Sequence, residues 1–90
     1  MKYYYVAQKK FWKNYAKLPL SQKESTKKAW QYFKQDPFDP RLRSYKIHTL
    51  SERYSRTIYA ACIEGDLRVL FYIEKDIVYS IHIGNHSIYN

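Results

Sequence analysis

The segment from residue 56 to residue 83 constrains the fold most, because it contains three strand-like runs joined by very short connections. Residues 56–63, 67–73 and 77–83 are rich in β-branched and aromatic side chains. Only Glu64-Gly65-Asp66 and Glu74-Lys75-Asp76 separate them. Connections this short permit antiparallel pairing only, and Gly65 tolerates the positive φ of a tight turn. The sequence therefore predicts a three-strand antiparallel meander.

Helical patterns fill most of the preceding sequence, after a short tyrosine-rich stretch at residues 2–6 that predicts a first strand. Phe11, Tyr15 and Leu18 recur at i, i+4 and i+7, which indicates an amphipathic helix between residues 7 and 18. Pro19 ends it. The order of strand, helices and strands predicts an α+β fold with helices packed on the meander.

A second helix is expected to begin at Ser21-Gln22-Lys23-Glu24, which has the form of a capping box. Ala29, Trp30 and Phe33 give this helix an apolar stripe, and Pro37 limits it because a residue before proline disfavours helical geometry. The two helices should form an antiparallel pair joined by a tight turn.

The length of the chain and its cysteine content limit the class of protein. Ninety residues suit one small domain, residues 1–90, and the single cysteine, Cys62, excludes an intramolecular disulfide. Cys62 lies in an apolar run, so we interpret it as a small core residue and not as a nucleophile. Since no run resembles a secretion signal or a membrane span, we expect a cytoplasmic protein that does not bind membranes.

The formal charge of +8 is unevenly distributed. Residues 1–56 hold 14 Lys and Arg against 4 acids, giving +10, whereas residues 57–90 hold 2 against 4, giving −2. A field of this sign favours a polyanion such as nucleic acid, or an acidic protein partner. A surface that only confers solubility is the alternative.

Basic side chains are concentrated between residues 37 and 53, where the composition predicts a loop with some strand character, and Arg56 follows at the start of the first strand of the meander. They are Arg41, Arg43, Lys46, His48, Arg53 and Arg56. Alternation with apolar residues would place Leu42 and Ile47 on the core and direct the cations outward. This is a suitable arrangement for a rim that binds RNA phosphates.

Arg68 is the only charged residue within an otherwise apolar strand, and strand alternation places it on the open face of the sheet. It either pairs with Glu64 or Glu74 or faces a groove that an anion can enter. The same alternation assigns a helix-covered face to two sets of residues: Leu67, Val69, Phe71 and Ile73, and Ile77, Tyr79, Ile81 and Ile83. His82 then shares the face of Arg68, where we interpret it as structural or as part of the rim.

His86 and Tyr89 follow the last strand, and Gly84 would allow the chain to fold back toward Arg68. A histidine, a phenol and a guanidinium around one phosphate could cleave RNA without a metal ion. Paired cysteines, histidines spaced for zinc and a glycine-rich phosphate loop are all missing from the sequence, so no metal or cofactor is expected.

The order of elements, with "LRVLF" in the middle strand and "IGNHSIYN" at the end, resembles the RelE/ParE toxin superfamily over nearly the whole chain. The resemblance implies a RelE-like fold with an open basic groove. It also implies an RNA-cleaving site that comprises Arg68, His86 and Tyr89, with Lys46 and, less directly, Arg43 and His48. Two features differ from many relatives: Cys62 stands where they carry an arginine, and residues 41–50 contain no acid that could act as a base.

By this resemblance the chain is a toxin of a type II toxin–antitoxin system, an endoribonuclease that cleaves mRNA on the ribosome. The 2′-hydroxyl would attack, Arg68 and Lys46 would stabilise the phosphate, His86 would transfer a proton and Tyr89 would orient the substrate. An antitoxin, commonly acidic, is the implied partner. The alternatives are a ParE-like inhibitor that binds DNA gyrase without catalysis and a nucleic-acid-binding module without toxicity.

Overall fold

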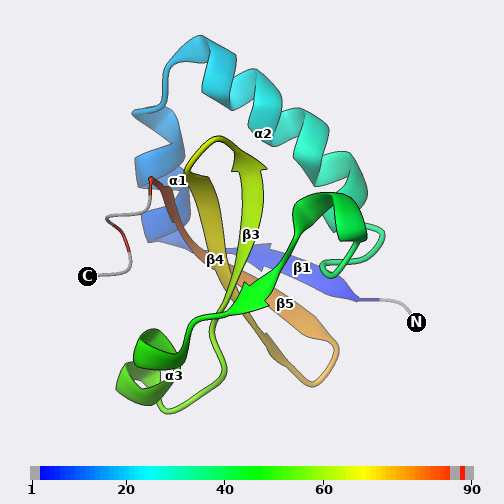
Figure 1. Ribbon diagram of the computed structural model, residues 1–90, viewed down its shortest axis with the longest axis vertical. Coiled ribbons are helices and arrows are strands. Elements are labelled where there is room, and N and C mark those ends of the chain that lie inside the picture. The colour runs from blue at the N-terminus through cyan, green and yellow to red at the C-terminus, as the bar shows by residue number, and fades with distance from the viewer. Residues whose placement is uncertain (1–2, 86–87, 89–90) are drawn as a thin grey trace.

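The computed structural model describes residues 3–85 and Ile88, and within them a mixed sheet carries helices on both faces (Figure 1). The elements, in order, are β1 (Tyr4–Ala7), α1 (Lys9–Ala16), α2 (Leu20–Phe33), the short 3₁₀ helix η1 (Pro40–Leu42), β2 (Tyr45–Lys46), α3 (His48–Tyr54), β3 (Tyr59–Glu64), β4 (Leu67–Glu74) and β5 (Ile77–Gly84). None of the described helices is long and apolar enough to cross a membrane.

The sheet has the order β1-β5-β4-β3-β2. β1 runs parallel to β5, and the remaining neighbours are antiparallel. The predicted meander is thus confirmed as β3, β4 and β5. Gly65 adopts a φ of +48°, as the first turn requires, and Lys75 adopts a φ of +59° in the second turn.

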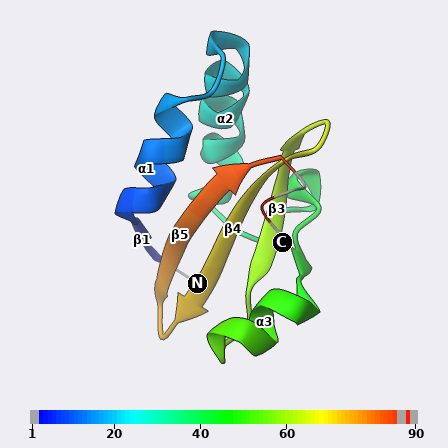
Figure 2. The same ribbon diagram turned by 90° about the vertical axis from the view of Figure 1, so that its left-hand side faces the viewer.

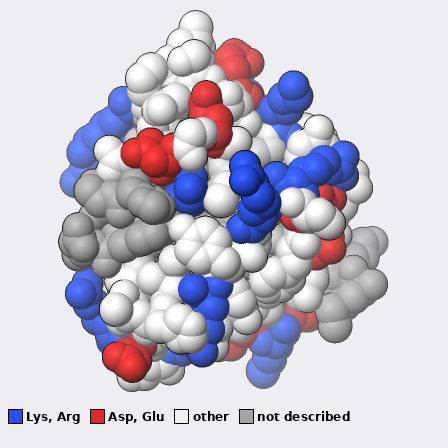
Figure 3. Space-filling view, in the orientation of Figure 1, with Lys and Arg blue, Asp and Glu red and all other residues white. Residues whose placement is uncertain are grey.

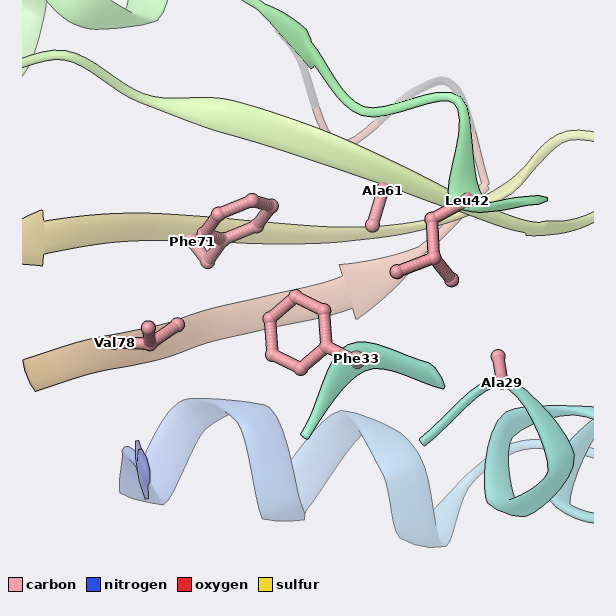
Figure 4. Packing of buried hydrophobic residues seen from close by; sticks show 6 residues of the cluster. All are labelled: Ala29, Phe33, Leu42, Ala61, Phe71 and Val78. Atoms are coloured by element: carbon pink, nitrogen blue, oxygen red, sulfur yellow. The ribbon is translucent and has the colours of Figure 1, made fainter. Parts of the chain in front are cut away.

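The principal core lies between the sheet and the pair α1 and α2. Figure 4 shows Phe33 of α2 directed toward the strands that carry Phe71 and Val78. The rings of Phe33 and Phe71 meet edge to face with centroids 5.0 Å apart. Phe11 of α1 packs on a neighbouring cluster that contains Leu67, Val69 and Ile83.

The capping box predicted at Ser21 is wrong. Pro19 takes the N-cap position of α2, and no side chain caps that end. Proline fixes its own φ near the value that precedes a helix and lacks an N–H that would need a partner, so the helix can begin one residue earlier, at Leu20. α1 ends at Ala16 and α2 begins at Leu20, so the tight turn predicted between the two helices is confirmed. The helices diverge from this turn (Figure 1).

The segment predicted as a basic loop contains a helix, α3, that the sequence prediction missed. Only Tyr45–Lys46 forms the expected strand, at the edge of the sheet. Leu42 and Ile47 are buried, as predicted, while Lys46 is exposed. The α3 helix packs on the second face of the sheet, opposite α1 and α2 (Figure 2), through a cluster of Ile47, Leu50, Ile58, Ala60 and Leu70.

The predicted faces of β5 are wrong for most of the strand. Phe71 pairs with Ser80 and Leu70 with His82, so Ile81 is an extra residue in a β-bulge. The bulge reverses the alternation along the strand. Val78 and Ser80 therefore face α1 and α2, as Ile83 does beyond the bulge, whereas Tyr79 stacks on Tyr72 on the α3 face.

Candidate nucleic-acid interface

A cleft of about 820 Å³ opens on the sheet face that carries α3. Its walls come from α1 and α3, and its floor comes from β4 and β5. Four cationic or titratable bases line it: Lys10, Arg53, Arg56 and His82. None of the described residues that line this cleft is acidic, so the local field favours an anion.

The α3 helix is fixed to the sheet by Leu50, which is 2% exposed, and by Ser51. The Ser51 hydroxyl donates to the Ile47 carbonyl at 2.8 Å and accepts from the Ile58 amide at 2.8 Å. The Arg56 amide donates to the Ser51 carbonyl at 3.2 Å. These bonds hold the connection between α3 and β3, and they place Arg53 and Arg56 at the edge of the cleft.

A stack of three side chains continues the cleft along the floor. The Arg56 guanidinium lies 4.3 Å from the centre of the Tyr72 ring, and the Tyr72 and Tyr79 rings stack with centroids 4.8 Å apart. Arg56 also forms an ion pair of 3.2 Å with Glu74. Glu74 is thus the partner of Arg56. A planar cation on aromatic rings provides a surface that bases can stack on.

His82 lies half-buried on the cleft floor. Its Nδ1 is buried, and no hydrogen-bond partner for that atom occurs in the part of the chain that the structure describes. Burial lowers the pKa of the imidazole, and the positive charge of Lys10 lowers it further. Lowering the pKa from its ordinary value near 6.5 keeps the ring neutral at pH 7, the state in which it can accept a proton.

Ile88 shows where the chain goes after β5. It packs against the cluster of α3 and lines the cleft, and its amide donates to the Asn85 carbonyl at 3.0 Å. A Cβ on Gly84 would lie 2.6 Å from Cγ2 of Ile88, so the glycine is required for this close approach. The chain therefore turns back over the α3 face. His86 and Tyr89, two of the predicted catalytic residues, lie outside the described residues.

Arg68 occupies the predicted face but lies near the other end of β4. Its register partners are Cys62 and Gly84, and its Nη1 donates to the carbonyls of Gly65 at 2.8 Å and Leu67 at 3.2 Å. Arg68 thus braces the turn between β3 and β4. Arg68 does not line the cleft in the part of the chain that the structure describes.

The remaining predicted residues divide into two groups. Arg53 and Arg56 come together in the cleft, whereas Lys46 is exposed on the edge strand β2, opposite Tyr59. Arg41 lies 3.7 Å from the centre of the Tyr32 ring and pairs with Asp39 at 2.8 Å. This pair, with its hydrogen bonds, lowers the pKa of Asp39 to about 2. Arg43 and His48 are exposed beyond the cleft lining.

The sequence prediction missed the contribution of α1. Lys10 and Asn14 are four residues apart, so they share one side of the helix and form a wall of the cleft together with Gln8. The sequence shows the four-residue spacing of Lys10 and Asn14. Only the position of α1 over β5, next to the open face, shows that this side borders the cleft.

Charge is distributed in groups over the surface. Figure 3 shows blue basic side chains in several separate groups, including some near the middle of this face, with red acidic side chains beside some of them. Among the described residues, Lys10, Arg53, Arg56 and His82 line the cleft between α1 and α3.

The sequence matches no protein-family model and no curated protein. Solved structures do match the fold. The archaeal RelE–RelB complex from Pyrococcus horikoshii OT3 contains a chain with a TM-score of 0.71 and 15% identity, over 94% of this chain and 96% of that one. A copper-bound mutant toxin from Helicobacter pylori has a TM-score of 0.64 and 15% identity, over 96% of this chain and 97% of that one. This chain therefore has the RelE-like toxin fold.

Proposed function

We propose that this protein is the toxin of a toxin–antitoxin system and that it cleaves RNA without a metal ion, with mRNA on the ribosome as its substrate. The observation that carries the proposal is the cleft of Lys10, Arg53, Arg56 and His82, which no described acidic residue lines, in a chain with the RelE-like fold. The charges attract a polyanion, and the histidine supplies a group that can move protons near neutral pH.

RNA carries its own nucleophile, so the protein needs few groups. The 2′-hydroxyl loses its proton and attacks the adjacent phosphorus, the bond to the 5′-oxygen breaks, and that oxygen takes up a proton. The products are a 2′,3′-cyclic phosphate and a 5′-hydroxyl. Arg53 and Arg56 neutralise the charge that develops on the phosphate, as guanidinium groups do in other phosphoryl transfers.

Proton transfer has two candidate histidines. His86 remains the prediction from the sequence, and His82 is the histidine that lines the cleft. Replacing the group that transfers the proton should lower cleavage about a hundredfold or more. Comparing His82→Ala with His86→Ala in a cleavage assay identifies which of them acts, and equal activity of both variants and the wild type would refute a histidine mechanism.

Arg56 allows a controlled test of the cleft. Arg56→Ala removes the guanidinium, whereas Glu74→Gln removes its ion-pair partner and keeps the guanidinium. We expect Arg56→Ala to reduce cleavage at least about tenfold, because a charged hydrogen bond to phosphate contributes about 1.5–3 kcal/mol. Glu74→Gln should cleave like the wild type. A wild-type rate for Arg56→Ala would show that the RNA does not occupy this cleft.

Whether the protein cleaves mRNA in cells can be tested by expressing it in bacteria and mapping the 5′ ends of the mRNA. Cut transcripts would support the proposal, and the dependence of cutting on translation would test the role of the ribosome. DNA damage without cut transcripts would instead favour the gyrase-inhibiting alternative. Growth without either effect would leave a binding module as the function.

An antitoxin partner follows from the same proposal, since the Pyrococcus structure is that of a RelE–RelB complex. The formal charge of +8 favours an acidic partner. Association should be fast at low salt and weaken as salt is added, because screening shortens the range of the attraction.

A further inference from the structure

Three side chains form a column on the α3 face, at the end of the sheet where a hairpin joins β4 to β5. The Arg56 guanidinium lies 4.3 Å from the centre of the Tyr72 ring, and the Tyr79 ring stacks 4.8 Å from it with 19° between the ring planes. Arg56 comes from the segment before β3, on one side of β4, and Tyr79 from β5 on the other, so they cover opposite faces of Tyr72. A further flat group can therefore join the column only at an end.

One end of the column, the outer side of Tyr79, adjoins β1 at the edge of the sheet. Val6 of β1 is the register partner of Tyr79 and is 44% exposed. The Tyr5 hydroxyl donates to the Phe33 carbonyl at 2.7 Å, which directs Tyr5 toward α2. Its neighbours Tyr4 and Val6 therefore lie on the face that carries Tyr79. Tyr4 is 65% exposed, so the column ends at an open shelf of Val6 and Tyr4.

The column is held in place by its contacts. Arg56 forms an ion pair with Glu74 at 3.2 Å, and the Gln8 amide donates to the Tyr72 hydroxyl at 3.5 Å. A ligand that stacks on Tyr79 would meet a platform that is already ordered, so its binding would cost little conformational entropy of the protein. Stacking of one base on an aromatic side chain strengthens binding about 5–150-fold. The column and the shelf therefore suit a flat aromatic ligand such as a nucleobase.

Charge decides which part of a nucleic acid faces the shelf. The column is continuous with the cleft, because Arg56 and Tyr72 belong to both, and the cations of the cleft attract phosphates. The Tyr4 amide donates to the Asp76 carbonyl at 2.9 Å, so the hairpin Glu74-Lys75-Asp76, with two acids and one base, lies beside the shelf. This hairpin disfavours phosphates. A bound strand is thus oriented with its phosphates in the cleft and an uncharged base on the shelf.

We propose that the shelf holds one base of a single RNA strand, stacked on Tyr79 and bordered by Val6 and Tyr4, while the phosphates of that strand lie in the cleft. The inference rests on the proposed function, because it gives the RNA a fixed position next to the phosphate that is cleaved. Tyr79 and Tyr4 are positioning residues, since they contact a base and not the reacting atoms. Stacking reads no hydrogen-bond pattern, so the shelf accepts every base.

Short DNA strands test the shelf without cleavage, because they lack the 2′-hydroxyl that attacks. Each strand has about eight nucleotides, a length that single-strand grooves accommodate. One strand carries adenine at every position, and the other keeps the sugars and phosphates but has no bases. In fluorescence anisotropy titrations the adenine strand should bind at least about fivefold more tightly than the baseless strand. Equal binding of the two strands would overturn the proposal, because only phosphates would then be bound.

Variants of Tyr79 locate the base. Tyr79→Leu removes the ring and keeps an apolar side chain, so it should weaken binding of the adenine strand at least about fivefold and leave binding of the baseless strand unchanged. Tyr79→Phe keeps the ring and should bind both strands like the wild type. A variant that had lost its fold would bind neither strand, so the baseless strand also controls for folding. Wild-type binding of the adenine strand by Tyr79→Leu would refute the stacked base.

Exposed aromatic side chains on the two faces of the sheet provide a matched comparison. Tyr4→Ser should also weaken binding of the adenine strand, by a smaller factor, because Tyr4 borders the base without forming the stack. Trp12→Leu should bind like the wild type, because Trp12 is 56% exposed but lines the groove between α1 and α2 on the other face. Self-association of the chain that Tyr4→Ser abolishes would assign the shelf to a second copy and overturn the proposal.

Cleavage kinetics distinguish a positioning role from a catalytic one. With an RNA strand, Tyr79→Leu should raise KM at least about fivefold and leave kcat unchanged, since the stacked base binds equally in the ground state and in the transition state. A fall in kcat at unchanged KM would place Tyr79 at the reacting atoms and refute the proposal. The DNA titrations require no cleavage. A protein that binds the adenine strand through Tyr79 but never cuts RNA would therefore contradict the endoribonuclease and leave the base site supported.

Discussion

Replacing Gly84 with alanine tests whether close packing between β5 and Ile88 shapes the cleft. The new Cβ would lie 2.6 Å from Cγ2 of Ile88, a separation that forces one group to move. Overpacking of this kind costs about 1–3 kcal/mol, and the lower entropy of the unfolded alanine chain returns about 0.4–1 kcal/mol. We therefore expect the free energy of unfolding to fall by about 1–2 kcal/mol.

The protein could also accommodate the new Cβ by displacing Ile88, and this lowers the free energy of unfolding by a similar amount. If Ile88 leaves its position, it loses its partial burial against the α3 cluster. Full burial of isoleucine contributes about 1.5–3 kcal/mol, so half of it contributes ~1 kcal/mol. In urea the midpoint should fall at an unchanged slope, and the melting temperature should fall by at least about 4 °C.

Gly65→Ala is the matched control. Gly65 has a φ of +48° and no atom within 4 Å of its hypothetical Cβ, so alanine there costs about 1–2 kcal/mol through backbone strain alone. Both variants should lose similar stability, but only Gly84→Ala should shift the methyl resonances of Ile88 and change RNA cleavage. Unchanged stability and unchanged Ile88 resonances in Gly84→Ala would refute the packing argument.

Three further predictions concern stability. Phe71 is fully buried, so Phe71→Ala should lower the free energy of unfolding by about 3–5 kcal/mol in urea titrations, and a loss below about 1 kcal/mol would contradict its central place in the core. The Tyr5 hydroxyl donates to the Phe33 carbonyl at 2.7 Å, so Tyr5→Phe should cost ~1 kcal/mol by the same measurement, and no loss would mean that water replaces the bond. Burial and Lys10 lower the pKa of His82, so unfolded chains bind its proton more readily and stability should fall as pH decreases below about 6.5. His82→Gln should reduce this acid dependence, and an identical pH profile would exclude His82 as its source.

The fold could be predicted to the extent that local patterns decide it. Short connections left the β3 to β5 meander no alternative pairing, and apolar periodicity located α1. The α3 helix was missed because its seven residues, His48–Tyr54, contain one buried side chain, Leu50, and no capping residue. Packing against the sheet stabilises so short a helix, and its sequence holds no periodic signal.

The faces of β5 could not be predicted because one extra residue reverses them. Strict alternation assigns every second residue of a whole strand to the same face of the sheet. The bulge at Ile81 divides β5 into two parts, in which this assignment is reversed. His82 nevertheless shares the face of Arg68, as predicted, because both lie on the same side of the bulge. The contribution of Lys10 depends on where α1 crosses the sheet, which is a property of tertiary packing.

Arg68 and the cleft cations lie along one face of the sheet, and they need not be alternatives. Four residues separate Arg68 from Tyr72 on β4, which corresponds to ~13 Å at the rise of a strand. Grooves that bind single strands hold runs of about 4–16 nucleotides, far longer than this separation. One RNA strand laid along β4 could therefore contact Arg68 near the turn and Arg56 over Tyr72 at once. Ile88 packs on the same face, so its position limits how much of β4 the strand can reach.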